Sequence, residues 1–193
     1  MNFKSYDILS SLIPGFLLLL GLLNFFDIHY EKDFIIGYTA IAFLGGYLLN
    51  TIGSWLEDFY FFTWGGKPSS NLLEGKGIWK VKIYNAASLK QHLSQKTTNP
   101  APTNDELFGI AMRTSNGAND NRIEDFNANY AFSRTLLTTV IICGVLILIS
   151  NFKDWHYYAI ILPTIFIFWL RCKQRGYYYS KEVLNVYSKL NGI

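Results

Sequence analysis

Four apolar blocks, separated by segments that hold nearly all of the charge, constrain this chain more than any other feature. Each block runs for sixteen to twenty-three residues without an Asp, Glu, Lys or Arg. An α-helix needs about 20 such residues to cross the ~30 Å hydrocarbon layer of a membrane. The pattern therefore predicts an all-α membrane protein with four transmembrane helices, at residues 8–26, 34–56, 135–151 and 155–170.

The spacing of the blocks divides the chain into four parts. Each pair of blocks is joined by a short turn, and the 70 residues 65–134 lie between the two predicted hairpins. That length suffices for a small folded module but not for a large core. We therefore expect a transmembrane hairpin, a cytoplasmic module, a second transmembrane hairpin and a cytoplasmic C-terminal helix, over residues 1–64, 65–134, 135–171 and 172–193.

The basic residues predict which side of the membrane these parts occupy. Fifteen of the seventeen Lys and Arg lie in the N-terminal stub, the central segment and the tail, whereas the two turns hold only Lys32 and Lys153. Basic segments beside spans stay in the cytoplasm. We therefore predict a multi-pass protein of the bacterial inner membrane with both termini cytoplasmic. We expect Arg171, Lys173 and Arg175, just after the last block, to contact anionic lipid headgroups.

Local patterns predict small elements within the module. Residues 77–84 alternate apolar side chains with lysines, which predicts a short strand. Residues 86–95 have helical composition, and Thr103 followed by Glu106 predicts a helix that begins with a capping box. Residues 122–137 run into the third block without a helix breaker, so we expect one helix of about thirty residues there.

The tail after the fourth block has an apolar stripe at helical spacing, which predicts an amphipathic C-terminal helix. Its placement is open. The stripe packs on the module or on a neighbouring protomer, or else the helix lies on the inner leaflet of the membrane. We take the stripe as the candidate partner-binding surface: Tyr179, Val183, Val186, Tyr187 and Leu190.

Small residues follow one another at four-residue intervals along the second block and predict a close helix contact. Asn50 in this ridge needs a hydrogen-bond partner in hydrocarbon, where an interhelical bond is worth about 0.6–1.7 kcal/mol. The ridge packs either inside one four-helix bundle or against another protomer, where it could also line a pore. The candidate helix-packing and oligomer residues are Ala42, Gly46, Asn50, Gly53 and Ser54.

The side chains that usually carry catalysis form no motif in this sequence. Gly-Gly-Lys at residues 65–67 resembles the end of a phosphate-binding loop, but the upstream glycine is missing and Pro68 follows the lysine. A Cys172 nucleophile with His92 as its base lacks an orienting residue. The spans hold no Asp, Glu, Lys or Arg of the kind that ion-coupled transporters use, and we take His156, near the outer surface, as an interfacial residue. We therefore expect no enzyme activity, no catalytic residue, no cofactor and no metal site.

Two stretches carry a resemblance to a known family, SYDILSSLIPGFLLL at residues 5–19 and GGYLLNTIGSWLEDF at residues 45–59. With the four-span layout, the chain resembles small inner-membrane proteins of antiphage defence operons, in particular the membrane subunit of Kiwa-type systems. The resemblance implies a non-enzymatic, oligomeric membrane sensor or anchor that recruits a cytoplasmic effector during infection. It implies no role for any individual residue.

Two functions fit these patterns. The first is a membrane sensor or scaffold whose partners are membrane lipid, a soluble cytoplasmic protein and further copies of the chain, taken as a tetramer, without direct contact to nucleic acid. The alternative is a pore-forming effector that depolarises the cell through an oligomeric channel. Selective channels line their path with carbonyls or charged side chains, and only Glu57 lies near the predicted inner mouth.

Overall fold

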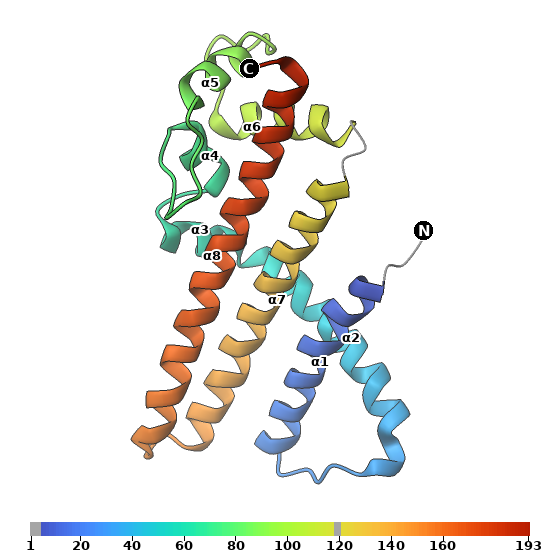
Figure 1. Cartoon of the computed structure of the whole chain (residues 1–193). Helices are drawn as coiled ribbons and strands as arrows, with labels where there is room; N and C mark the ends of the chain where they lie inside the picture. Colours follow the sequence, from blue (N-terminus) through green and yellow to red (C-terminus); the bar gives the residue numbers. More distant parts are fainter. Residues whose placement is uncertain (1–4, 118–120) are drawn as a thin grey trace. The chain divides into compact units, whose positions relative to one another are not determined.

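The structure is a computed structural model, and it describes residues 5–117 and 121–193. These residues are helical without a strand, which confirms the all-α class (Figure 1). The elements in chain order are α1 (Ser5–Phe25), the 3-10 helix η1 (Lys32–Phe34), α2 (Ile35–Trp55), α3 (Glu57–Trp64), α4 (Pro68–Leu73), α5 (Ala86–Ser94), α6 (Asn104–Asn116), α7 (Asn121–Ser150) and α8 (Trp155–Asn191).

The described residues form two compact units. The apolar unit consists of residues 5–57 and Ala131–Cys172, and the module consists of the described residues of Asp58–Tyr130 with Lys173–Ile193. The boundary between them falls within α7 and within α8, so each of these two helices contributes residues to both units.

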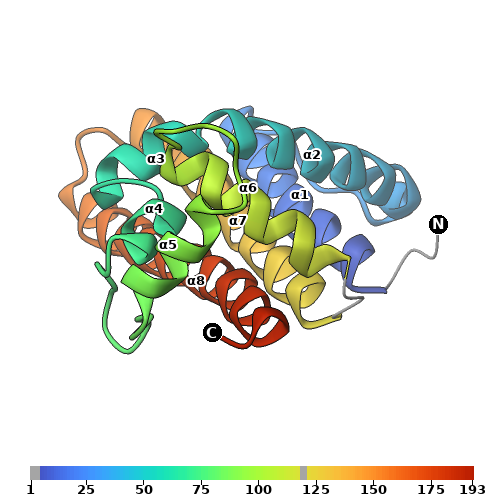
Figure 2. The ribbon, with the colours of Figure 1, turned by 90° about the horizontal axis from the view of Figure 1, so that it is seen from above.

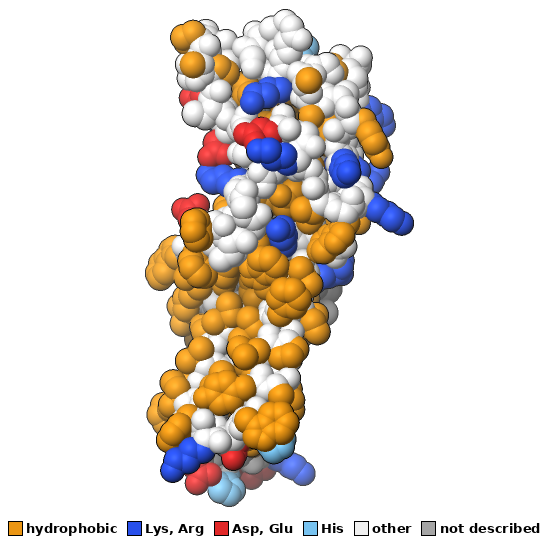
Figure 3. Space-filling model, turned by 90° about the vertical axis from the view of Figure 1, so that its left-hand side faces the viewer, with side chains coloured by type: hydrophobic (Ala, Val, Ile, Leu, Met, Phe, Trp, Pro, Cys, Tyr) orange, Lys and Arg blue, Asp and Glu red, His pale blue; other side chains and the backbone are white. Residues whose placement is uncertain are grey.

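The four apolar blocks of the sequence all lie in helices. Among the described residues, two stretches are long and apolar enough to cross a membrane, Lys32–Trp55 and Arg122–Ser150. Ser10–Phe25 is apolar but shorter. The sixteen apolar residues 155–170 form the start of α8, which then continues past Arg171. On the face shown in Figure 3, hydrophobic side chains cover the apolar unit, and charged and histidine side chains gather at its end.

Helices α1 and α2 pack so closely that only glycine fits where they cross. A Cβ added to Gly15 would overlap the carbonyl oxygen of Ala42 and lie 2.7 Å from the backbone nitrogen of Gly46. A Cβ at Gly46 would overlap the carbonyl oxygen of Ser11. This is the close backbone approach that a small-residue ridge permits. The ridge of α2 is therefore used inside one chain.

The module is built around the C-terminal part of α8, beside which α4, α5 and α6 lie (Figures 1 and 2). Its buried core joins these helices and includes Leu72, Leu89, Leu107, Val183 and Leu184. The predicted capping box is confirmed: the Thr103 hydroxyl accepts from the Glu106 backbone N–H, and the Glu106 carboxylate accepts from the Thr103 N–H. The continuous α7 of 30 residues is confirmed as well.

The strand predicted at residues 77–84 is wrong. Ile78 and Val81 form an isolated bridge in which each backbone N–H donates to the other's carbonyl, at 3.2 and 2.8 Å. The chain therefore reverses at Trp79, whose φ is 45°. The alternation has a different origin: Val81 and Ile83 point into the helical core, and the lysines beside them point out.

The C-terminal helix is not a separate element, because α8 runs unbroken from Trp155 to Asn191. Nor does its apolar stripe form a partner surface. Val183, Val186 and Tyr187 are buried in the module core. Half-buried Tyr179 stacks on Tyr130 with ring centroids 6.2 Å apart. Of the predicted stripe only Leu190 is exposed, so packing on the module accounts for the pattern.

Candidate interaction surface

Residues 77–84 form an exposed loop, called here the Trp79 loop, which two buried side chains anchor to the module. Val81 and Ile83 are 1% and 9% exposed and anchor it in the module core. Gly77 closes its start, because a Cβ there would overlap the carbonyl oxygen of Val81 and lie 2.5 Å from the Lys82 side chain. Two buried anchors and a tight start fix the position of the loop.

The turn at the tip of this loop places an indole ring in solvent. Trp79 adopts the left-handed φ of 45°, which is unfavourable for a bulky side chain and costs on the order of 1–3 kcal/mol. Its side chain nevertheless remains 59% exposed, so burial of the ring does not repay this cost. Strain of this kind clusters at binding and switch sites.

The exposed side of the Trp79 loop combines aromatic and basic residues. Tyr84 is 98% exposed, and Lys80 and Lys82 are exposed beside it. Trp and Tyr are enriched among the residues that dominate binding energy at protein interfaces. The lysines add positive charge, which favours an acidic partner surface.

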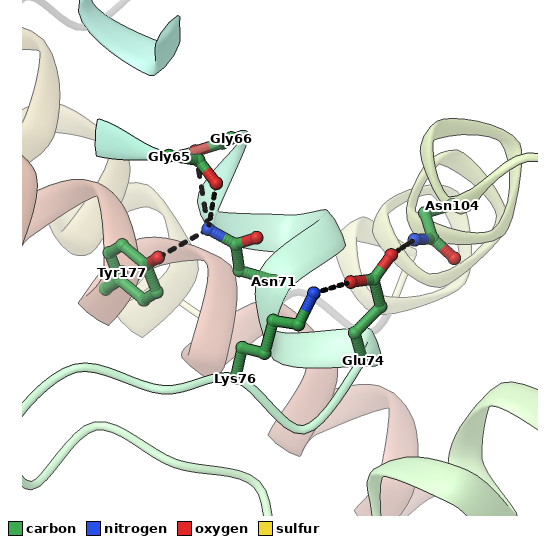
Figure 4. Close-up of polar contacts among 7 residues, drawn as sticks. All are labelled: Gly65, Gly66, Asn71, Glu74, Lys76, Asn104 and Tyr177. Carbon is green, nitrogen blue, oxygen red and sulfur yellow. Dashed lines mark hydrogen bonds and ion pairs between the residues drawn. The ribbon is translucent and has the colours of Figure 1, made fainter. Parts of the chain in front are cut away.

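A polar network secures the start of this loop (Figure 4). Glu74 accepts from the Lys76 ammonium at 2.8 Å and from the Asn104 side-chain amide at 3.0 Å. The hydrogen bond and charge of Lys76 lower the pKa of Glu74, and Glu74 in turn raises the pKa of Lys76. Glu74 thus joins the residue that leads into the loop to the first residue of α6.

The glycine pair before α4 serves as a helix cap, which removes the phosphate-loop interpretation. Gly65 and Gly66 have φ of 80° and 116°, and their N–H groups donate to the carbonyls of Phe62 and Phe61 at the end of α3. These bonds have the pattern of a Schellman motif. The Asn71 amide contacts both glycine carbonyls and donates to the Tyr177 hydroxyl at 2.7 Å (Figure 4). The N–H groups that would hold a phosphate are occupied.

The surroundings of His92 and Cys172, the two side chains considered for nucleophilic chemistry, favour structural roles. The Nδ1 atom of His92 lies 3.0 Å from the Tyr187 hydroxyl, which secures α5 to α8. Cys172 is buried in the apolar unit, and burial raises the pKa of its thiol to about 12. A thiol with such a pKa stays protonated at neutral pH and is a poor nucleophile. In the part of the chain that the structure describes, no group of three or more His, Cys, Asp and Glu could hold a metal ion.

The predicted ridge on α2 is divided between two neighbours. Ala42 and Gly46 lie against α1, whereas Gly53 lies against α7, where an added Cβ would be 2.9 Å from the Thr138 hydroxyl. Ser54 is exposed, so it takes no part in this internal packing: the ridge turns away from the bundle at this residue. The described chain uses the rest of the ridge for internal packing.

Asn50 has hydrogen-bond partners on a neighbouring helix. Its side-chain oxygen accepts from Thr135 at 3.2 Å and from the Arg134 guanidinium at 3.4 Å. The same guanidinium pairs with Glu57 at 3.1 Å, and the two side chains are 12% and 27% exposed. We call Asn50, Glu57, Arg134 and Thr135 the Arg134 cluster. It joins α2 and the start of α3 to α7.

The residues predicted to meet lipid headgroups lie in different environments. Arg171 is exposed, and Arg175 is half-buried. Lys173 donates to the carbonyl oxygen of Trp64 at 3.2 Å, and partial burial lowers its pKa. Lys173 therefore has a protein partner within the module, and Arg171 is the most accessible of the three.

Trp79 and Tyr84 were not predicted from the sequence as surface residues, nor was Arg134 predicted as the centre of a cluster. The lysine alternation of residues 77–84 indicates the exposed side of the loop, but the turn at Trp79 depends on backbone hydrogen bonds, which the sequence pattern does not indicate.

No protein-family model, no curated protein and no solved structure matches this chain.

Proposed function

We propose that the chain is a four-span membrane scaffold whose module recruits a soluble protein. Four apolar helical stretches support the span count, because residues 8–26 reach the usual span length of about 17–25 residues and residues 155–170, with the same uncharged composition, come within one residue of it. The distribution of basic residues supports a cytoplasmic module. The module has a core of its own, so it suits a folded docking domain better than a linker.

The observation that carries the proposal is the Trp79 loop. It presents Trp79 and Tyr84 to solvent on a backbone fixed by Val81 and Ile83. A rigid loop loses little conformational entropy on binding, so its exposed rings contribute efficiently to affinity. With Lys80 and Lys82 adjacent, the partner that fits is a protein with an apolar pocket surrounded by carboxylates.

For the biological process, we propose antiviral defence, because residues 5–19 and 45–59 resemble membrane subunits of antiphage systems. We place the scaffold in antiviral defence, as a sensor that holds an effector at the inner membrane. Homo-oligomerisation belongs to this proposal too. Because Gly46 and Ala42 are used within the chain, an oligomer would have to form through other faces.

Removing the exposed ring and reversing one charge should strongly weaken recruitment. In full-length protein reconstituted in nanodiscs, Trp79→Ala with Lys80→Glu should reduce retention of the soluble partner by about tenfold or more, as expected for a hot-spot side chain worth 1.4 kcal/mol or more. The measurement is quantitative mass spectrometry of proteins retained from nuclease-treated cytosol of cells that encode the chain, repeated with the purified partner.

The matched control reverses two exposed lysines elsewhere in the module, Lys96→Glu with Lys189→Glu. This control should retain the partner as the wild type does, because it changes the net charge of the module without touching the Trp79 loop. Equal retention by all three proteins, or equal loss in both variants, would remove the loop from the proposal.

The pore alternative receives less support from the geometry. Glu57, the candidate for a charged ring at the inner mouth, pairs with Arg134 of its own chain. A carboxylate committed to this pair offers less charge to passing cations. Reproducible conductance of liposomes that contain only the purified chain, lost in Glu57→Ala, would contradict the scaffold and favour the pore.

A further inference from the structure

A cavity of about 420 Å³ lies within the apolar unit, between α1, α7 and α8. Its volume falls in the range of small-molecule sites, which is about 300–1,000 Å³. The lining residues extend from Leu17 to Asn24 on α1 and from Thr139 to Ile147 on α7. On α8 they extend from Ile160 to Thr164. The cavity thus lies towards the end of α1, the end of α7 and the beginning of α8.

The wall of this cavity is more apolar than its residue types suggest. The hydroxyls of Thr139 and Thr164 donate to carbonyls of their own helices, those of Thr135 and Ile160, each at 2.8 Å. The Cys143 thiol donates to the carbonyl of Leu17 at 3.6 Å. These polar groups are satisfied without a ligand, so they present mainly carbon to the cavity.

One polar group stands at the end of this apolar wall. Asn24 is exposed, lines the cavity and lies one residue before the end of α1. In the proposed topology this end faces the outer leaflet, next to the two short turns. The cavity therefore offers hydrocarbon along its length and an amide at the interface. This polarity matches one lipid molecule, with its acyl chain inside and its ester or headgroup beside Asn24.

The extent of the cavity favours a lipid tail over a second protein chain. Nine residues of α7 from Thr139 to Ile147 cover about 12 Å, whereas a membrane helix packs over about 30 Å. A rigid transmembrane helix packed there would contact the cavity with less than half of the helix's own length. A flexible acyl chain adapts to a short recess.

We infer that this cavity binds one acyl chain of an outer-leaflet phospholipid, with Asn24 at the glycerol ester. The inference rests on the membrane assignment of the proposed function but not on partner recruitment. Bound lipid would fill space between α1 and the α7–α8 pair and would therefore stabilise their packing.

The test uses phosphatidylethanolamine with a diazirine in one acyl chain, incorporated into nanodiscs with the full-length chain. After illumination, peptide mass spectrometry should find labelling concentrated at residues 17–24 and 140–147. Val140→Phe fills the cavity and should reduce that labelling by about fivefold or more. Val145→Phe makes the same change on the same helix at an exposed residue outside the cavity and should leave labelling unchanged.

The wild-type labelling pattern decides the question even if Val140→Phe fails to fold. Labelling spread evenly over exposed residues such as Ile41 and Leu44 of α2 would overturn the inference. So would a disulfide between protomers that carry Leu20→Cys, formed on mild oxidation, because a second copy would then occupy the cavity. Labelling of no residue would overturn the membrane assignment itself, which distinguishes the two failures.

Discussion

Gly46→Leu is expected to destabilise the apolar unit by more than about 3 kcal/mol, beyond the usual range for over-packing. The reason is that the obstructing atoms belong to the backbone of α1: a Cβ at Gly46 would lie 2.5 Å from the Ser11 carbonyl carbon and 2.9 Å from its Cα. Backbone atoms cannot turn aside as a side chain can, so α1 and α2 must separate. The measurement is the free energy of unfolding in detergent micelles titrated with SDS.

Gly37→Leu is the matched control on the same helix. Apart from the adjoining residues and the backbone of α2 itself, no heavy atom lies within 4 Å of a Cβ at Gly37, so the added leucine meets open space on the outside of α2. Its effect should stay within about 0.5 kcal/mol, as for most surface substitutions. If Gly46→Leu were as stable as Gly37→Leu, the crossing of α1 and α2 described above would be wrong.

Arg134→Met is expected to cost about 3 kcal/mol, the lower end of the range for breaking a buried ion pair, because the Glu57 side chain is still 27% exposed. The variant removes both the 3.1 Å pair with Glu57 and the 3.4 Å hydrogen bond to Asn50. Both acceptors then lose a donor in surroundings with little water. The same SDS titration measures the loss.

Arg122→Met provides the comparison, because Arg122 pairs with Glu182 at a similar distance of 3.2 Å, with side chains 69% and 12% exposed. Since the Arg122 guanidinium is in water, this pair should cost less to break than the Arg134 pair. The double variant Arg134→Met with Glu57→Gln should lose at least about 0.5 kcal/mol less than the sum of the single losses, since the two residues are in contact. Equal costs at Arg134 and Arg122, or strict additivity, would contradict the buried Arg134 cluster.

Local signals predicted much of the fold. Uncharged apolar runs predicted the helices of the apolar unit, and Thr103 with Glu106 predicted the start of α6, because a capping box depends on residues three apart. Asn50 could be predicted to need a partner from its chemistry alone. Each of these features is decided by a few neighbouring residues or by the cost of burying one group.

Features that depend on distant residues could not be predicted. Tyr187 and Val183 recur at the spacing of any amphipathic helix, which predicts an apolar face but not what covers it. In the structure, α5 and α6 of the module cover this face. In the sequence, Arg134 lies at the edge of a predicted span, and only the packing of α2 and the start of α3 on α7 brings Asn50 and Glu57 next to it. Residues 77–84 do not form the predicted strand, because the described residues contain no second strand with which they could pair.

Labelling of single cysteines in intact cells tests the four-span scaffold most directly. Glu31 and Lys153 lie in the two short turns, and Gln95 lies at the end of α5 in the module; all three are exposed. Buried Cys172, with its pKa near 12, adds little background. An impermeant maleimide should label Glu31→Cys and Lys153→Cys in intact cells but label Gln95→Cys only after permeabilisation. Labelling of Gln95→Cys in intact cells as strongly as Glu31→Cys would contradict the cytoplasmic module, and with it the proposed scaffold.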